Sequence, residues 1–127
     1  MPDTPSAPRP LQFGRIAPTV SVADMARSMR FYCGVLGFDK SFENGDPVRF
    51  VILERDAAEL HLALNTAHQA TQENVAHLMV SDARALHGHL VASGVRIVKA
   101  LRDADYGLRT FVFADPDGNC IDAGEAI

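Results

Sequence analysis

An internal repeat constrains the fold of this 127-residue chain more than any other feature. Residues 49–61 align without a gap with residues 110–122, at a constant offset of 61 positions. Three identities fall at that offset, namely Phe50 with Phe111, Val51 with Val112 and Asp56 with Asp117. Because the order of predicted elements also repeats, we interpret the chain as two copies of one structural unit.

Each unit is predicted to contain a strand, a helix and three further strands, which is an α+β fold of two βαβββ modules. Asp24 and Asp82 stand where helix N-caps belong, and Gly37 and Gly94 are placed to end the helices. The first module is predicted over residues 15–64, with an apolar helical stripe of Met25, Met29, Tyr32 and Leu36. The predicted strands cover residues 16–23, 38–43, 48–54 and 59–64, and then 75–80, 95–101, 110–114 and 119–125.

The remaining segments are predicted to be a proline-rich flexible tail and a linker. Four of the seven prolines lie in residues 1–14, and the single domain is expected to occupy 15–127. Residues 65–74 are polar and join the first module to the second, which is predicted over residues 75–125. Residues 115–119 have the composition of a tight turn between two strands.

Composition excludes several classes of partner. With 47% hydrophobic and 22% charged residues the chain is expected to be globular, and no apolar run is long enough to enter a membrane. The formal net charge of −4 and the scattered cations argue against nucleic acid. Cys33 and Cys120 are far apart in the sequence, and the 127 residues show no pattern of a secretion signal. We therefore expect free thiols and a cytoplasmic location.

Strand alternation predicts which side chains face an open cleft. Leu60 and Leu62 are expected to pack against the helices, which turns Glu59 and His61 the other way. The same rule assigns further residues to this face: Thr19, Ser21, His77, Met79, Cys120 and Asp122. Buried polar groups are costly unless paired, so this mixture of histidines, carboxylates, hydroxyls and a thiol predicts a ligand site or a water-filled pocket.

Two motifs resemble a known superfamily. Residues 20–38 contain Phe31-Tyr32 and Leu36-Gly37-Phe38, and Tyr106-Gly-Leu-Arg109 precedes Asp115-Pro-Asp-Gly-Asn119. They resemble the signatures of the vicinal oxygen chelate superfamily, which comprises glyoxalases, bleomycin resistance proteins and extradiol dioxygenases. The resemblance spans residues 15–125 and implies curled mixed sheets around a concave cleft, in a homodimer.

The resemblance also implies four metal-ligand positions, which fall on Ala17, His61, Val75 and Asp122. Alanine and valine carry no donor atom, and two ligands are fewer than catalytic sites normally present. This departure favours the metal-free bleomycin-resistance branch and no cofactor. The alternative is one divalent ion (Zn, Ni, Fe or Mn) held by His61, Asp122 and a displaced His77.

Tyr106 and Arg109 lie in or beside the loop before the predicted seventh strand, and in the resistance branch this loop borders the drug cleft. The resemblance implies that Tyr106 stacks on a flat ligand and that Arg109 anchors the loop or an acidic group. Four strand phenylalanines are candidate cleft walls or core residues: Phe42, Phe50, Phe111 and Phe113.

These observations lead to one functional hypothesis and two alternatives. The first is a bleomycin-resistance-like protein that sequesters a drug or an aromatic metabolite in a dimer cleft without metal, which would confer antibiotic resistance. The second is a metal-dependent lyase, isomerase or dioxygenase that uses His61 and Asp122. The third is a binding domain for a small metabolite, with no role in resistance.

Overall fold

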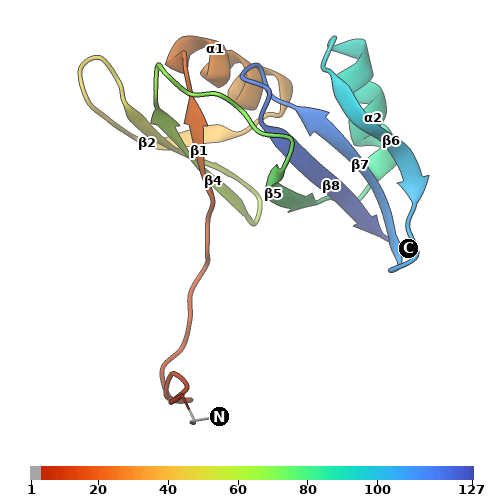
Figure 1. Ribbon diagram of the computed structural model, residues 1–127, viewed down its shortest axis with the longest axis horizontal. Helices are drawn as coiled ribbons and strands as arrows, with labels where there is room; N and C mark the ends of the chain where they lie inside the picture. The colour runs from red at the N-terminus through yellow and green to blue at the C-terminus, as the bar shows by residue number, and fades with distance from the viewer. Residues whose placement is uncertain (1–3) are drawn as a thin grey trace.

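The computed structural model describes residues 4–127 and contains the predicted element order in both halves. The first module contains β1 (Thr19–Val22), α1 (Met25–Met29), a π-helical segment η1 (Arg30–Val35), β2 (Asp39–Asn44), β3 (Phe50–Arg55) and β4 (Ala58–Leu64). The second contains β5 (Asn74–Met79), α2 (Ala83–Ala92), β6 (Ile97–Asp103), β7 (Leu108–Ala114) and β8 (Cys120–Ala126). The two modules lie side by side, with the N-terminal segment extending away from the first (Figure 1).

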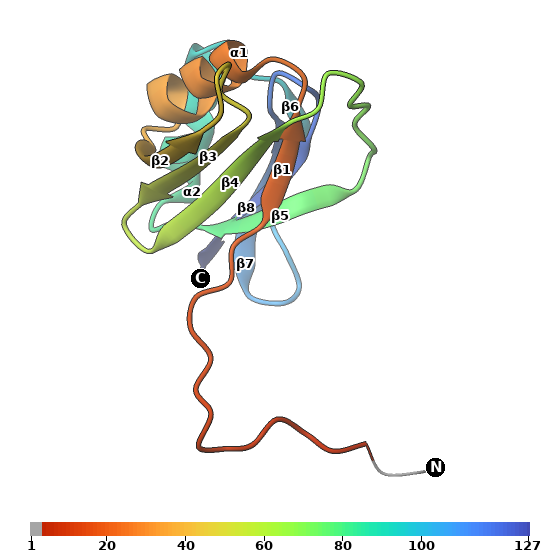
Figure 2. The same cartoon turned by 90° about the vertical axis from the view of Figure 1, so that its left-hand side faces the viewer.

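Each module forms one four-stranded mixed sheet, ordered β1-β4-β3-β2 in the first and β5-β8-β7-β6 in the second. In both sheets the first strand pairs in parallel with the last, and the remaining pairs are antiparallel. The two mixed sheets and their helices confirm the predicted α+β fold. The identical strand order in both halves is what two copies of one structural unit would have. Figure 2 shows the sheet of the first module face-on, with its helix along one edge of the view.

Both helices begin at the predicted caps. The side chain of Asp24 accepts a hydrogen bond from the N–H of Arg27, and that of Asp82 accepts one from Ala85, each at 3.0 Å. The chain leaves α2 through Gly94 at φ +76°, a conformation that glycine adopts without steric cost. Local capping chemistry therefore sets where the helices begin and end.

The first strand is shorter than the alternation predicts. It begins at Thr19 and not at residue 16, because Pro18 has no N–H to donate to a sheet ladder. The carbonyl of Pro18 accepts a hydrogen bond from the N–H of His61 at 3.0 Å. The first paired residues of β1 and β4 are Thr19 and His61.

The predicted apolar stripe on the first helix faces the core. Tyr32 and Leu36 are buried, and Met25 and Met29 are half-buried and pack against the core. In η1 the N–H of Leu36 bonds to the carbonyl of Phe31, five residues back. This wider turn rotates the residues that follow it relative to a regular helix. Phe31, at the start of the turn, is buried in the core.

The turn between β7 and β8 joins the modules. The N–H of Ala23 donates to Asp117 Oδ1 at 3.2 Å, and Arg27 Nη2 approaches the same oxygen at 2.7 Å. The buried hydroxyl of Tyr32 donates to Asp115 Oδ2 at 2.7 Å. One hydrophobic core runs through both modules, from Val20 and Tyr32 in the first to Phe113 and Ile121 in the second.

Residues 4–18 contain no helix or strand, and within them Arg15 pairs with Glu54 and Glu59. The predicted flexibility of residues 1–14 concerns motion and stays a prediction, and residues 1–3 lie outside the described part of the chain. In the described part, neither helix has the length or the apolar character required to cross a bilayer.

Candidate functional site

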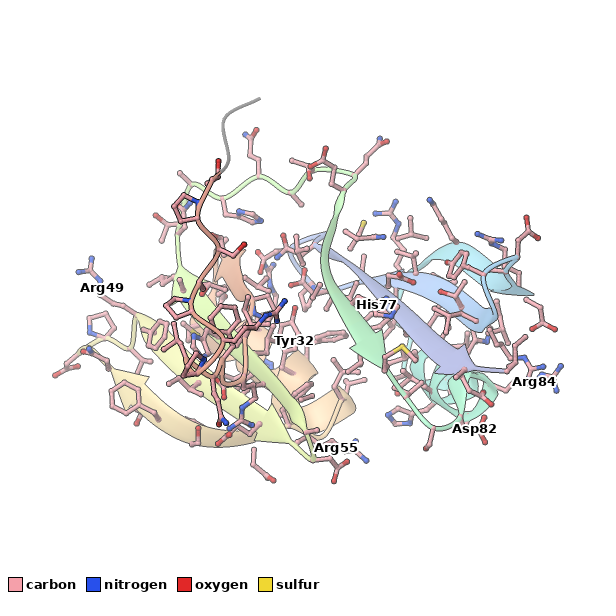
Figure 3. The ribbon with its side chains drawn as sticks, turned by 90° about the horizontal axis from the view of Figure 1, so that it is seen from below. Tyr32, Arg49, Arg55, His77, Asp82 and Arg84 are labelled. Atoms are coloured by element: carbon pink, nitrogen blue, oxygen red, sulfur yellow. The ribbon has the colours of Figure 1, made fainter. Side chains whose placement is uncertain are left out.

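One face of each sheet packs into the core and the other is left open. Val20, Leu60 and Leu62 are buried on the core side, so Thr19 and His61, which are register partners on β1 and β4, lie on the opposite face. On the second sheet, α2 packs against β6, β7 and β8, and His77 is exposed on the other side. Figure 3 shows the two open faces from below, with His77 on β5 near the junction of the modules.

On the first open face, a histidine lies between a carboxylate and an aromatic ring. Nε2 of His61 is 2.7 Å from Glu59 Oε2, and Glu59 Oε1 is 3.1 Å from Arg15 Nε. The ring of Phe50 meets His61 edge-to-face at 5.3 Å between centroids, and Phe42 follows Phe50 at 6.4 Å. These groups provide an aromatic surface with a charged end, suited to a planar ligand that carries a polar substituent.

On the second open face, a second histidine is held by a carboxylate. Nδ1 of His77 is 2.8 Å from Asp122 Oδ2, and Nε2 is 3.0 Å from the sulfur of Met79. The Thr110 hydroxyl, which has one proton to donate, lies 2.6 Å from Asp122 Oδ1 and 2.8 Å from the carbonyl of Ala123. Asp122 therefore fixes the orientation of the His77 ring, and its own position is fixed from β7.

A groove of about 320 Å³ separates the modules and brings residues from both together. Glu59 lines it from β4 and His77 from β5, with Ile16 of the N-terminal segment at its side. Its volume is near the lower end of the range for small-molecule sites. The predicted cleft residues that line this groove are Glu59, His77, Met79 and Phe113.

The predicted cleft walls Phe111 and Phe113 are misplaced. They are 1% and 0% exposed, and Phe111 packs edge-to-face on His87 of α2 at 5.1 Å. Their strand neighbour Thr110 faces Asp122 on the open side, so residues 111 and 113 must face the helix. Phe113 contributes to the floor of the groove between the modules, but neither ring forms part of the open face.

Arg109 lies on the helix side of its sheet, whereas Cys120 lies on the predicted face but is buried. Nε of Arg109 is 2.9 Å from Asp103 Oδ1, and its strand partner Glu125 accepts a hydrogen bond from the first residue of α2, which places Arg109 on the helix side. This contact holds the pKa of Asp103 below its ordinary value, and it spans the loop between β6 and β7, in agreement with the loop-anchoring alternative predicted for Arg109. Cys120 faces the open side but is only 5% exposed, so it is out of reach of a ligand.

Tyr106 is 64% exposed in the turn before β7, where it is free to contact a ligand. Thr19 is exposed, and Ser21 is half-buried beside Ala63 of β4. The sequence reasoning did not find Thr110, which completes the Asp122 contacts. Its position opposite the last strand of the module was the available signal, since cross-strand partners share a face.

Within residues 4–127, no three histidine, cysteine, aspartate or glutamate side chains lie close enough together to hold a metal ion. His77 and Asp122 are in contact, but His61 instead pairs with Glu59 on the other sheet. The suggested set of His61, His77 and Asp122 is therefore not assembled within one chain.

Two βαβββ modules, each with a mixed four-stranded sheet and a helix, define a class of small α+β domains. The model of the Glyoxalase/Bleomycin resistance protein/Dioxygenase superfamily matches residues 12–122, and the chain belongs to this superfamily. No curated protein matches the chain.

Solved structures have the same fold. A superfamily member from Sphaerobacter thermophilus is 26% identical with a TM-score of 0.77, covering 91% of this chain and 99% of that one. The bleomycin-binding protein from Streptomyces verticillus, solved in complex with copper(II)-bleomycin, is 25% identical with a TM-score of 0.73, covering 92% and 99%. The bleomycin resistance determinant encoded on transposon Tn5 is 19% identical with a TM-score of 0.77, covering 90% and 98%.

Proposed function

We propose that this protein binds and sequesters a drug or an aromatic metabolite, noncovalently and without a metal, in a cleft shared by two copies of the chain. The observation that carries the proposal is the composition of the two open faces. Each has a histidine paired to a carboxylate within its own sheet, and the two first-strand positions where related enzymes hold a metal are Ala17 and Val75. These groups can bind a ligand without an added ion.

The exposed apolar residues on these faces support a binding role. Phe42 and Met79 are about half exposed, and Val75 is more than a third exposed. Exposed apolar groups that border paired charges are typical of ligand grooves and of contacts between chains. Closing two such faces over one planar ligand would bury both sets of apolar groups.

The similarity to the Streptomyces verticillus protein supports the choice of ligand class. That protein binds copper(II)-bleomycin, and it is matched over nearly its whole length. This chain has no tryptophan, so the stacking surface would come from Phe50, His61 and the exposed Tyr106.

The alternative is a metal-dependent enzyme, favoured by the placement of His61 and Asp122 on the last strands of their modules. In a dimer, His61 of one copy could meet His77 and Asp122 of the other. A divalent ion held there would polarise neighbouring oxygen atoms of a substrate. His61 and Asp122 would be ligands of that ion, and His77, which Asp122 contacts at Nδ1, would be the displaced third ligand.

Metal content and ligand binding separate the two functions. In the first experiment, untagged protein is incubated with zinc, nickel, iron(II) or manganese and desalted, and its metal content is measured by plasma mass spectrometry. In the second, copper(II)-bleomycin is titrated into the protein and its affinity is measured by calorimetry. We expect no stoichiometric metal, and saturable binding of the drug by a dimer identified by light scattering. Loss of the His61 ring contact should weaken affinity by about fivefold, from the roughly 1 kcal/mol of an aromatic pair.

The matched control is His89→Ala, because His89 lies on α2, away from both open faces. His89→Ala should leave drug affinity unchanged where His61→Ala lowers it. About one equivalent of a retained ion that is lost in His61→Ala would overturn the metal-free proposal in favour of the enzyme. Failure to bind copper(II)-bleomycin would contradict the assignment of the drug.

A further inference from the structure

Strand β6 has two register shifts against β7, one between Ile97 and Lys99 and one between Lys99 and Arg102, and the second decides whether its two cations share a face. It pairs with β7 through Lys99 with Val112 and Arg102 with Thr110, with a register shift in between. Residues three apart in a regular strand point to opposite faces, so the bulge is what turns Lys99 and Arg102 to the same side. Because Thr110 contacts Asp122, that side is the open face.

The register arranges this face in two rows. The first row crosses the sheet through Lys99, Val112, Asp122 and His77. The second crosses it through Arg102, Thr110, Gly124 and Met79. Neighbouring strands are about 4.8 Å apart, so the two cations lie within side-chain reach of the Thr110 and Asp122 positions. Gly124 has no side chain, which leaves space above the second row. A Cβ at this position would lie 3.4 Å from the His77 ring.

A small cavity of about 80 Å³ lies among these side chains. Its polar lining comes from Lys99, Arg102, Thr110, Asp122, Asn74 and the exposed Tyr106. The cavity is too small for a drug-sized molecule, and it suits a single functional group of a larger ligand.

The charges around the cavity favour an anion. Within residues 4–127, neither Lys99 nor Arg102 has an ion-pair partner, although both are exposed. The one carboxylate in the lining, Asp122, already has His77 on one oxygen and Thr110 on the other. A guanidinium and an ammonium side by side form a typical donor set for carboxylate or phosphate oxygens.

We propose that this cavity binds the anionic group, of carboxylate or phosphate size, of the ligand that the open faces enclose. The inference rests on the proposed function, because the cavity shares its face with His77 and Asp122. It adds a ligand class, namely a planar molecule with an acidic substituent. Lys99 and Arg102 hold the acid, and the aromatic groups of the opposite sheet hold the ring.

The test uses the free anions, because the ligand is not identified. Sodium phosphate and sodium acetate are titrated separately into ¹⁵N-labelled protein at constant ionic strength, and amide shifts are followed by NMR. We expect at least one anion to give saturable shifts centred on Lys99, Arg102 and Tyr106. Stronger binding of phosphate would identify a phosphorylated ligand, and stronger binding of acetate a carboxylic acid.

Substitutions show whether the cavity is responsible. Lys99→Gln combined with Arg102→Gln should weaken binding at least tenfold, and because both side chains are exposed the variant should keep a native spectrum. Arg96→Gln, an exposed cation just before β6 that does not line the cavity, should bind as wild type. Equal affinity in all variants, or no saturable binding of either anion, would overturn the inference.

The two proposals fail in different ways. If an anion binds through Lys99 and Arg102 but copper(II)-bleomycin does not bind, the site stands and the drug assignment falls. If copper(II)-bleomycin binds and neither anion does, the proposed function stands and the anion site is refuted.

Discussion

The hydroxyl of Tyr32 tests how the two modules are held together. Tyr32 is fully buried, and its hydroxyl donates to Asp115 Oδ2 at 2.7 Å across the boundary between the modules. Asp115 also accepts from the N–H groups of Asp117 and Asn119 and from Asn119 Nδ2, each at 2.9 Å. Tyr32→Phe removes one of these four donors and leaves the ring packing in place.

The expected cost follows from the charge of the acceptor. A hydrogen bond to an ionised group contributes about 1.5–3 kcal/mol, so Tyr32→Phe should lower the free energy of unfolding by about 2 kcal/mol. For a domain of this size that corresponds to a fall in Tm of about 8 °C. Asp115→Ala removes the acceptor for all four donors, and it should cost about 4 kcal/mol because several buried hydrogen bonds are lost together.

The assay is urea unfolding followed by far-ultraviolet circular dichroism, since the chain has no tryptophan to report by fluorescence. Tyr106→Phe is the control, because it removes the same hydroxyl from a side chain that is 64% exposed. It should change stability by less than about 0.5 kcal/mol. If Tyr32→Phe costs no more than Tyr106→Phe, the buried hydrogen bond does not stabilise the junction and the reasoning is wrong.

Further predictions concern pH, backbone and thiol chemistry. Burial first, and the charge of Asp115 second, raise the pKa of Tyr32 well above its ordinary value of 10.0, so the unfolded chain loses this proton at a lower pH than the folded one. The free energy of unfolding should therefore fall as pH rises above about 10, and an equal fall in Tyr32→Phe would contradict this assignment. Gly94→Ala, at φ +76°, should cost about 1 kcal/mol in urea unfolding, whereas Gly88→Ala inside α2 should stabilise by up to about 1 kcal/mol. The same sign for both glycines would refute the backbone explanation. Burial raises the pKa of Cys33, so iodoacetamide at pH 8 should modify it more slowly in folded than in urea-unfolded protein, as followed by mass spectrometry; equal rates would contradict this.

Local chemistry made most of the fold predictable. Asp24 and Asp82 cap their helices because an aspartate side chain satisfies a free N–H from within its own turn. Leu60 and Leu62 are buried as alternation predicts, since side-chain direction in a strand depends only on neighbouring residues. The late start of β1 at Thr19 was also readable, because Pro18 cannot donate to a ladder.

The candidate site was less predictable, because it depends on contacts between distant residues. Alternation found His77 and Asp122, but not that Thr110 completes their contact, which joins residues on three strands. The likeness to the family placed Arg109 at a cleft, whereas strand register places it on the helix side. A resemblance in motif therefore did not fix the orientation of a side chain.

The sequence by itself determined the duplicated βαβββ order, the helix ends and the alternation along the strands, because these depend on residues close together in the chain. Only the tertiary structure decided that Tyr32 meets Asp115 across the modules and that a bulge turns Lys99 and Arg102 to one face. Both depend on hydrogen bonds and packing between segments far apart in the sequence. Which bonds form there is set by the free energy of the whole fold, and no local pattern of residues encodes it.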